Sequence, residues 1–216
     1  VVEQEASVAV CPGCEERIEW VRSPMCPVCS QVFESRQGPD HLCGECQADP
    51  PPFRRARAAA IYEGPPATAI KRFKFGRQLA YLPVLKYWLS QPWCRQLLDK
   101  ADLLIPVPLH PRRLKARGFN QALLLAQGFP ELPLGREVIV RVRHTKPQIG
   151  LNPKQRRENV KGAFVVPHPE QVKGKRILLL DDLYTTGATA KECARVLRKA
   201  GAQQVEVLTV ARVRHE

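Results

Sequence analysis

The stretch ILLLDDLYTTGAT, residues 177–189, constrains the fold of this chain more than any other part of the sequence. It continues an aliphatic strand, KRILLLDD, that ends in two adjacent carboxylates, Asp181 and Asp182. Residues 188–201 then show helical spacing of apolar side chains with a glycine stop, and residues 204–213 are again strand-like. A strand, a helix and a strand with short links form a parallel crossover unit, and ligands bind beyond the carboxyl ends of such strands. The sequence therefore predicts an α/β fold with a ligand site at this loop.

The residues between the first strand and the helix suit a sugar phosphate. A helix N-terminus offers unpaired N–H groups and a partial positive charge, threonine hydroxyls add donors, and glycine allows close backbone approach. Two ionised carboxylates accept hydrogen bonds from the vicinal hydroxyls of a ribose. The plainer alternative is a threonine N-cap beside a solvated acidic pair, which accounts for Thr186 alone. The candidate ribose 5-phosphate residues are Asp181, Asp182, Thr185, Thr186, Gly187, Ala188 and Thr189.

Three C-x-x-C pairs mark the beginning of the chain as a cysteine-rich module. The prolines at 50–52 break the chain after it, so we expect a module over residues 1–50 and a larger domain over residues 51–216. Two pairs supply four thiolates to one tetrahedral metal, zinc above all, and a site closed by four thiolates is structural. Disulfides are the competing explanation, which three such pairs without a secretion signal disfavour. The spacing of a zinc ribbon pairs Cys26, Cys29, Cys43 and Cys46.

Cys11 and Cys14 have no partner pair after that assignment. His41 offers one further ligand, which does not complete a set of four. Either an upstream knuckle is missing from the chain, or Cys11 and Cys14 are a vestigial half-site. Cys94 and Cys193 stand alone in apolar surroundings, and we expect both to be packed in the core.

The net charge of +13 is unevenly distributed along the chain. Residues 1–50 hold 3 basic and 9 acidic side chains, whereas residues 51–216 hold 31 and 12. The larger part attracts a polyanion, either a phosphorylated small molecule or a nucleic acid, although a solvated basic surface is the plainer alternative. We expect a turn after a strand at 102–108, and a long loop over 144–159 that closes as a lid. The candidate pyrophosphate or polyanion residues there are Arg112, Arg113, Lys115, Arg117, Lys146, Arg156 and Arg157.

The rest of the larger domain alternates between strand-like and helix-like segments. Strands are expected at 56–62, 102–108 and 137–142, and helices at 65–75, 78–89 (interrupted at Pro83) and 119–129. No run approaches the roughly 18 apolar residues of a membrane span, and the first residues lack the layout of a secretion signal. We therefore expect a globular, cytoplasmic protein.

Residues 177–189 resemble the phosphoribosyl pyrophosphate signature of type I phosphoribosyltransferases. The resemblance implies the type I phosphoribosyltransferase fold, a parallel sheet flanked by helices, here with a small N-terminal zinc-ribbon module. It implies Asp181 and Asp182 at the ribose hydroxyls and Thr185 to Thr189 around the 5-phosphate. It also implies Mg²⁺, which shares the charge of the pyrophosphate with only one or two carboxylates.

The order of segments along nearly the whole chain is similar to the ComF family. Three C-x-x-C knuckles are followed by residues 70–78, 105–122 and 146–164 and then by the signature. That family contains the competence protein needed for DNA uptake in naturally transformable bacteria and a gluconate-associated relative. The resemblance implies a protein that handles single-stranded DNA in the cytoplasm with a partner helicase. The first of the family's usual four knuckles is missing here, consistent with the unpaired Cys11 and Cys14.

Two departures from the pattern bear on catalysis. Phosphoribosyltransferases that act on 6-oxopurines carry an Asp, their base toward the purine, where this chain has Thr185. The chain also ends three residues after 204–213, which leaves the module and residues 57–100 to form the wall beside an acceptor.

Two functions therefore stay open. The first is DNA handling, in which exposed aromatic rings stack on bases. The second is transfer of phosphoribose to an amine or a nucleobase, in salvage or metabolism. The candidate stacking groups, which would otherwise be core residues, are Phe73, Phe75, Tyr81 and Trp88.

Overall fold

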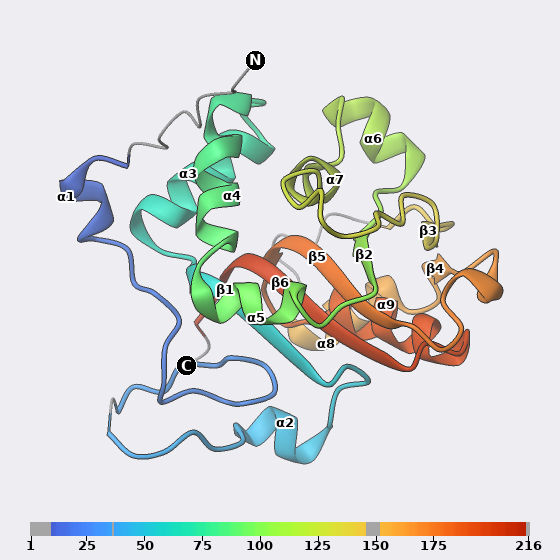
Figure 1. Cartoon of the computed structure of the whole chain (residues 1–216), viewed down its shortest axis with the longest axis horizontal. Coiled ribbons are helices and arrows are strands. Elements are labelled where there is room, and N and C mark those ends of the chain that lie inside the picture. The colour runs from blue at the N-terminus through green and yellow to red at the C-terminus, as the bar shows by residue number, and fades with distance from the viewer. Residues whose placement is uncertain (1–9, 36, 146–151, 215–216) are drawn as a thin grey trace.

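A four-stranded parallel sheet with the order β1, β6, β5, β2 lies at the centre of the molecule (Figure 1). The computed structural model describes residues 10–35, 37–145 and 152–214. The strands are β1 (Arg55–Ile61), β2 (Leu103–Pro106), β5 (Arg176–Tyr184) and β6 (Gln204–Arg212). Both faces of the sheet are covered, which explains why β5 and β6 are nearly continuous runs of buried residues.

Helices cover the two faces of this sheet and divide the core into two large clusters (Figure 1). One face packs against α3 (Gly64–Lys74), α4 (Leu82–Leu89), α5 (Pro92–Leu98) and α7 (Gln121–Ala126). The other face packs against α9 (Ala188–Lys199), on which α8 (Pro153–Val160) lies. None of the described helices is long and apolar enough to span a bilayer.

Short elements complete the described chain. They are α1 (Pro12–Glu15), α2 (Gly44–Ala48), η1 (Leu79–Tyr81), α6 (Pro111–Arg117), β3 (Val140–Arg141), β4 (Phe164–Val165) and η2 (Pro169–Gln171). β3 and β4 pair antiparallel, apart from the central sheet.

The predicted crossover unit is confirmed. β5 leads through α9 into β6, and the two strands pair in parallel from Arg176 opposite Gln204 to Tyr184 opposite Arg212. α9 turns its alanines, Cys193 and Leu197 to the sheet, and Cys94 is likewise buried in α5, as predicted for both single cysteines.

Three expectations about the basic segments need correction. The predicted turn after β2 is followed at once by the helix α6, which starts at Pro111 behind the N-cap His110. The predicted loop 144–159 contains α8, whose first turn is fixed by a capping box between Asn152 and Gln155. The strand expected at 137–142 reaches only Val140–Arg141. Lys146, which was placed on the loop, lies outside the described residues.

The helices at 78–89 and 119–129 are shorter than predicted. Pro83 lies in the first turn of α4, where its missing N–H costs nothing, so the chain forms the turn η1 before it rather than one long helix. α7 ends at Ala126, because the backbone of Gln127 and Gly128 closes back onto the last helical carbonyls.

The cysteine-rich module lies against one edge of the sheet (Figure 1). Its backbone pairs with β1: Val21 N–H donates to the Ala59 carbonyl at 3.1 Å, and Ile61 N–H donates to the Glu19 carbonyl at 2.8 Å. The division into residues 1–50 and 51–216 stays a prediction.

Candidate functional site

The turn between β5 and α9 is shaped by Gly187. Its φ of +71° lies in the left-handed region, and a Cβ there would be 2.5 Å from Cζ of Tyr184, nearer still to the hydroxyl. No other residue fits this position without moving the tyrosine ring, which is itself buried. Because Gly187 has no side chain, the loop backbone can approach a group at the N-terminus of α9 closely.

Thr186 is the most informative side chain of this loop. It is 7% exposed, and its Oγ1 has no hydrogen-bond partner within the part of the chain that the structure describes. A buried hydroxyl without a partner is costly, so this one, beside a helix N-terminus, is placed to donate to a water or a polar ligand. Thr186 also lines a cleft of about 580 Å³ between the loop and the module.

The two carboxylates at the end of β5 have different surroundings. Asp182 is 1% exposed and pairs with the Lys74 ammonium of α3, at 2.7 Å from Oδ2 and 3.0 Å from Oδ1. Asp181 is half-buried; its Oδ1 accepts from the Asp182 backbone N–H at 2.8 Å. The pair therefore presents one carboxylate held by a cation and one that makes no ion pair among the described residues.

These contacts set opposite charge states on the pair. Burial, followed by the neighbouring charge of Asp182, raises the pKa of Asp181 to about 8. Burial also disfavours ionisation of Asp182, but the Lys74 ammonium outweighs it and lowers the pKa of that carboxyl. The surroundings therefore favour the protonated form at Asp181 and the ionised form at Asp182.

Lys74 was not among the predicted site residues. It is one of three basic residues in the last turn of α3, where basic side chains usually interact with the helix dipole and with solvent. Nothing in that pattern singles out Lys74. Only its place in residues 70–78, one of the segments that resemble the ComF family, could have drawn attention to it.

The predicted basic residues fall into two groups. Arg112, Arg113, Lys115 and Arg117 lie on α6, whereas Arg156 and Arg157 lie on α8. Within α6, Arg113 donates to the Thr145 carbonyl at 3.3 Å and Arg117 to Gln121 Oε1 at 2.6 Å, and both are partly buried. Burial lowers the pKa of Arg117, whereas the charges of Asp182 and Asp181 act in the opposite direction.

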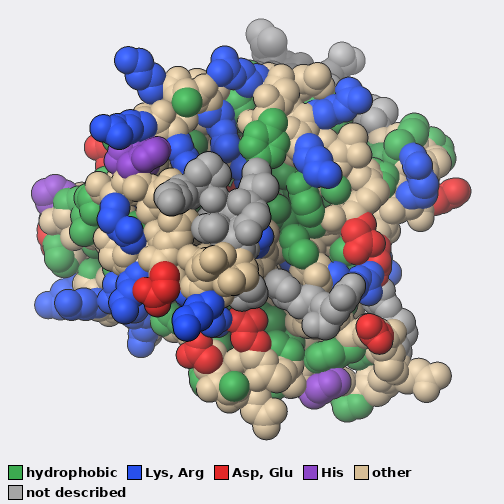
Figure 2. Space-filling model, turned by 180° about the vertical axis from the view of Figure 1, so that it is seen from behind, with side chains coloured by type: hydrophobic (Ala, Val, Ile, Leu, Met, Phe, Trp, Pro, Cys, Tyr) green, Lys and Arg blue, Asp and Glu red, His purple; other side chains and the backbone are tan. Residues whose placement is uncertain are grey.

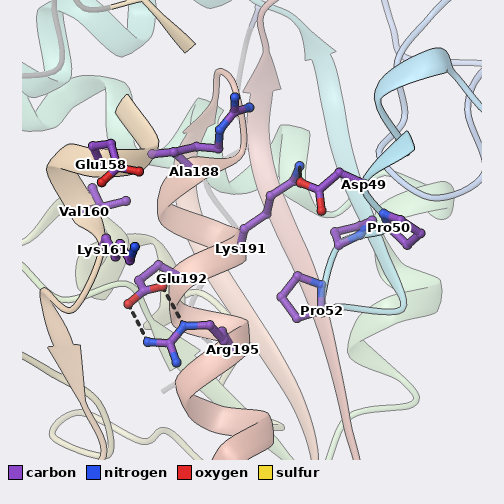
Figure 3. A pocket seen from close by; sticks show the side chains of 12 residues that line it. Asp49, Pro50, Pro52, Glu158, Val160, Lys161, Ala188, Lys191, Glu192 and Arg195 are labelled. Atoms are coloured by element: carbon purple, nitrogen blue, oxygen red, sulfur yellow. Dashed lines mark hydrogen bonds and ion pairs between the residues drawn. The ribbon is translucent and has the colours of Figure 1, made fainter. Parts of the chain in front are cut away.

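The basic side chains near α9 are neutralised by the module. Lys191 Nζ lies 3.1 Å from Glu45 Oε1 and 3.5 Å from Asp49 Oδ2, and Arg157 lies 4.0 Å from Glu45. Figure 3 shows Lys191 reaching toward Asp49 across a second pocket, of about 280 Å³. On α6, by contrast, the basic side chains make no ion pair with any described residue. A polyanion therefore meets uncompensated charge at α6 rather than at the first turn of α9, where Lys191 is paired.

Arg141 is a second residue that the sequence reasoning missed. It is 7% exposed, its Nη2 donates to Thr145 Oγ1 at 2.5 Å, and its guanidinium lies 5.2 Å from the ring centroid of Phe164. Its Nε has no partner among the described atoms, and burial, followed by the charge of Arg113, lowers its pKa. An arginine in a two-residue strand gives no signal in the sequence.

The four predicted zinc ligands come together. The sulfur atoms of Cys26, Cys29, Cys43 and Cys46 all lie within 4.8 Å of one another. The hydrogen bond from Cys29 lowers the pKa of Cys26 to about 4, so one thiolate, the form that binds metal, is already favoured. Four clustered thiols fit a closed tetrahedral metal site of the structural kind.

Cys11 and Cys14 lie together at the start of α1. Cys11 is exposed and Cys14 half-exposed, with Arg17 Nη2 at 3.6 Å from the Cys14 sulfur. Over the described residues, no group of three or more potential ligands includes either cysteine, or His41. Their role as an incomplete second site stays a prediction.

The cysteine cluster and the ligand loop share Arg212. This last residue of β6 is 1% exposed and donates to the Cys29 carbonyl and to Gln31 Oε1. Its guanidinium lies 5.4 Å from the ring centroid of Tyr184, the ring that packs under Gly187. One buried side chain therefore touches the cysteine cluster on one side and supports the loop on the other.

Comparisons with known proteins agree with this arrangement. A family model described as phosphoribosyl transferase domain matches residues 115–216. Competence protein F of Haemophilus influenzae is 32% identical over 223 residues, covering 96% of this chain and 92% of that protein. The DNA utilization protein YhgH of Escherichia coli O157:H7 is 34% identical, with 94% and 90% covered. Competence protein ComFC of Bacillus subtilis is 29% identical, with 94% and 84% covered.

Proposed function

Because the chain belongs to the ComF family of competence proteins and carries a phosphoribosyl transferase domain, we propose that it binds phosphoribosyl pyrophosphate or a related ribose 5-phosphate and takes part in DNA uptake during natural transformation. The cytoplasm is where it would meet both the sugar phosphate and the incoming strand. Single-stranded DNA and a helicase or other DNA-processing protein of the competence machinery are its proposed partners.

The unpartnered hydroxyl of Thr186 carries the proposal. A phosphate at the N-terminus of α9 would accept from this hydroxyl and from N–H groups of the first helical turn. Thr185, Ala188 and Thr189 complete the proposed cup. Gly187 supports the same reading, because its φ of +71° lets the backbone turn around a ligand.

The carboxylates would receive the ribose. A protonated Asp181 can donate to one hydroxyl oxygen while the ionised Asp182 accepts from another. Mg²⁺ binds ionised carboxylates, so it would displace the proton of Asp181, the carboxyl without a paired cation among the described residues. When bound, Mg²⁺ would neutralise charge on the pyrophosphate.

The pyrophosphate end would lie toward α6 and β3. Arg113 and Arg141 converge there on Thr145, and the Arg141 Nε still has a free hydrogen-bond position in the described structure. Arg112, Lys115 and Arg117 add charge from the same helix. Arginines suit this task because their planar donors match the oxygens of a phosphate.

A direct binding measurement tests the site. Calorimetry with phosphoribosyl pyrophosphate and Mg²⁺ should show binding that Thr186→Val weakens at least tenfold, since a hydrogen bond to a charged group is lost. Asp181→Asn with Asp182→Asn should weaken it further. Thr68→Val, a change at an exposed hydroxyl on α3, is the matched control and should change nothing. Unchanged binding in the double carboxylate variant would remove the site assignment.

DNA binding needs a separate test. The α6 charges are free to contact phosphates, so affinity for single-stranded DNA should fall steeply between 50 and 300 mM salt. Replacing both Arg112 and Lys115, which are exposed, by Gln should reduce the salt slope by about 1.4, since each contact with a single strand contributes about 0.7. Binding that is independent of salt would contradict this role.

A metabolic or salvage phosphoribosyltransferase is the alternative, favoured by the family match over residues 115–216. Thr185 cannot act as the base that 6-oxopurine enzymes carry there, so an amine or a base that needs no such help would be the acceptor. Pyrophosphate release measured across ammonia, small amines and nucleobases separates the two functions. If no acceptor in that panel causes pyrophosphate release while the sugar phosphate still binds, the binding role is favoured.

A further inference from the structure

Phe75 ends α3 with its ring open to solvent. Of the four aromatic residues that the sequence offered as stacking groups, Phe73 and Trp88 are 0% and 2% exposed and Tyr81 is half-buried. Phe75 is 59% exposed. Two of the four rings are therefore buried in the core, and Phe75 is the ring most able to contact a ligand.

This ring is held in place by α6. The guanidinium of Arg117 lies 5.8 Å from the Phe75 ring centroid and is itself fixed by Gln121 at 2.6 Å. Arg77, two residues after Phe75, donates to the Ala116 carbonyl at 2.6 Å and ties the end of α3 to α6. These contacts place the end of α3, and Phe75 with it, against α6.

Two neighbours of the ring, Lys74 and Arg117, interact with the carboxylate pair. Lys74, the residue before Phe75, is the one whose ammonium contacts Asp182. Burial lowers the pKa of Arg117, beside the ring, and this residue lies close enough to the carboxylate pair for negative charge on Asp182 and Asp181 to act in the opposite direction. A ligand whose sugar contacts the carboxylates would therefore extend its next chemical group toward Phe75 and Arg117.

The surrounding charge selects a phosphorylated ligand. Residues 103–130 and 138–145 together contain six Lys and Arg and no Asp or Glu. The two segments meet where Arg113 contacts Thr145 and where the rings of His110 and His144 approach to 5.1 Å between centroids. On the face of the molecule opposite Figure 1, Lys and Arg lie over the upper part and at the lower left, with Asp and Glu scattered among them (Figure 2).

We propose that Phe75 and Arg117 form a stacking site for an unpaired nucleobase, placed beside the carboxylate pair so that it takes the base of a nucleotide whose sugar phosphate occupies the loop. The inference rests on the proposed ribose 5-phosphate site and gives its ligand a base. A flat ring that stacks on Phe75 also meets the planar guanidinium of Arg117, a combination that tolerates any base. The base comes either from a free nucleotide or from a nucleotide of a DNA strand.

Paired ligands test the stacking site apart from the sugar-phosphate site. Calorimetry should show a ribonucleoside 5′-monophosphate binding about tenfold more tightly than ribose 5-phosphate. Phe75→Ala should abolish that difference and leave ribose 5-phosphate binding unchanged, whereas Phe75→Trp should retain it and show quenched tryptophan fluorescence. Tyr87→Ala, at another exposed aromatic residue (41%), is the control and should behave as the parent protein does.

The outcomes separate this inference from the function on which it rests. If ribose 5-phosphate binds but Phe75→Ala leaves the nucleotide affinity unchanged, the stacking site is wrong and the phosphate loop stands. If ribose 5-phosphate fails to bind while nucleotide affinity still depends on Phe75, the stacking site stands without the loop. If neither ligand nor any oligonucleotide binds, both proposals are wrong.

Oligonucleotides distinguish the source of the base. A 5′-phosphorylated thymidine oligomer should bind more weakly to Phe75→Ala, and the same oligomer with an abasic first nucleotide should bind parent and variant equally. That result assigns the base to DNA. A dependence on Phe75 shown only by mononucleotides assigns it to a free nucleotide, and independence from Phe75 in both arms overturns the site.

Discussion

Gly187 shows how narrowly a single residue determines the ligand loop. Gly187→Ala combines a left-handed φ with a clash against the Tyr184 ring, whereas Gly162→Ala has a similar φ of +66° and open space around its Cβ. We expect about 1 kcal/mol of destabilisation for Gly162→Ala and about 2–3 kcal/mol for Gly187→Ala. Urea unfolding measures both. Equal losses would mean that the Tyr184 ring moves aside without cost.

Asp181 makes stability depend on pH in a predictable direction. Its pKa rises from about 4 in the unfolded chain to about 8 in the folded protein, so the native state holds the extra proton between these values. The contribution of Asp181 is fully present below pH 4 and is lost as the pH rises through 8. Asp181→Asn should therefore flatten a decline in the free energy of unfolding between about pH 4 and 8, measured by urea titration at several pH values. A steeper decline in the variant would contradict the assignment.

Lys74 stabilises a charge that would otherwise be buried alone. Lys74→Met leaves the ionised Asp182 without its partner, and loss of one partner of a buried pair typically costs about 3–5 kcal/mol. Lys74→Met with Asp182→Asn should recover a large part of that loss, because no charge is then left buried. A double-mutant cycle by urea unfolding measures the coupling, and additive losses would mean that the pair contributes nothing as a pair.

At the scale of elements, the central unit was predictable and the basic helices were not. β5, α9 and β6 carry long apolar patterns because they are buried on the sheet, and such patterns are read directly from a sequence. α6 has seven residues, none of them buried, and a segment that short forms a helix only where its surroundings hold it. The site shows the same division. The sequence order placed Asp181 to Thr189 together, but Lys74 and Arg141 come to it from segments that only the tertiary fold brings near.

The capping box of α8 was present in the sequence as Asn152 and Gln155, yet the charged residues after it suggested a loop. Asn152→Ala should cost about 1 kcal/mol, because the side chain accepts from the Gln155 N–H and the Gln155 side chain accepts from the Asn152 N–H. Amide exchange over residues 153–160 should become faster, while Asn152→Ser should preserve protection. Unchanged exchange in the alanine variant would show that packing on α9 alone holds α8.

At the scale of the molecule, the cysteine cluster belongs to the same core as the sheet. Cys26, Cys29 and Cys46 pack in one cluster with residues of β5 and α9. Metal analysis should find one zinc per chain, and Cys43→Ser should lose it and lower the melting temperature of the whole protein in a single transition. Cys11→Ser is the control and should keep both the zinc and the melting temperature. A separate early transition in Cys43→Ser would mean that the module unfolds alone.

Arg212 links the cysteine cluster to the ligand loop, and this link limits how such proteins can diverge in sequence. A descendant that loses the four cysteines would no longer hold the loop around Cys29 that supplies oxygen acceptors to this arginine, and a buried guanidinium without acceptors is costly. Replacing Arg212 alone would remove the support beneath Tyr184 and Gly187. The cysteines and the arginine should therefore be inherited or discarded together, and a relative without the cysteines should have an uncharged residue at the end of this strand.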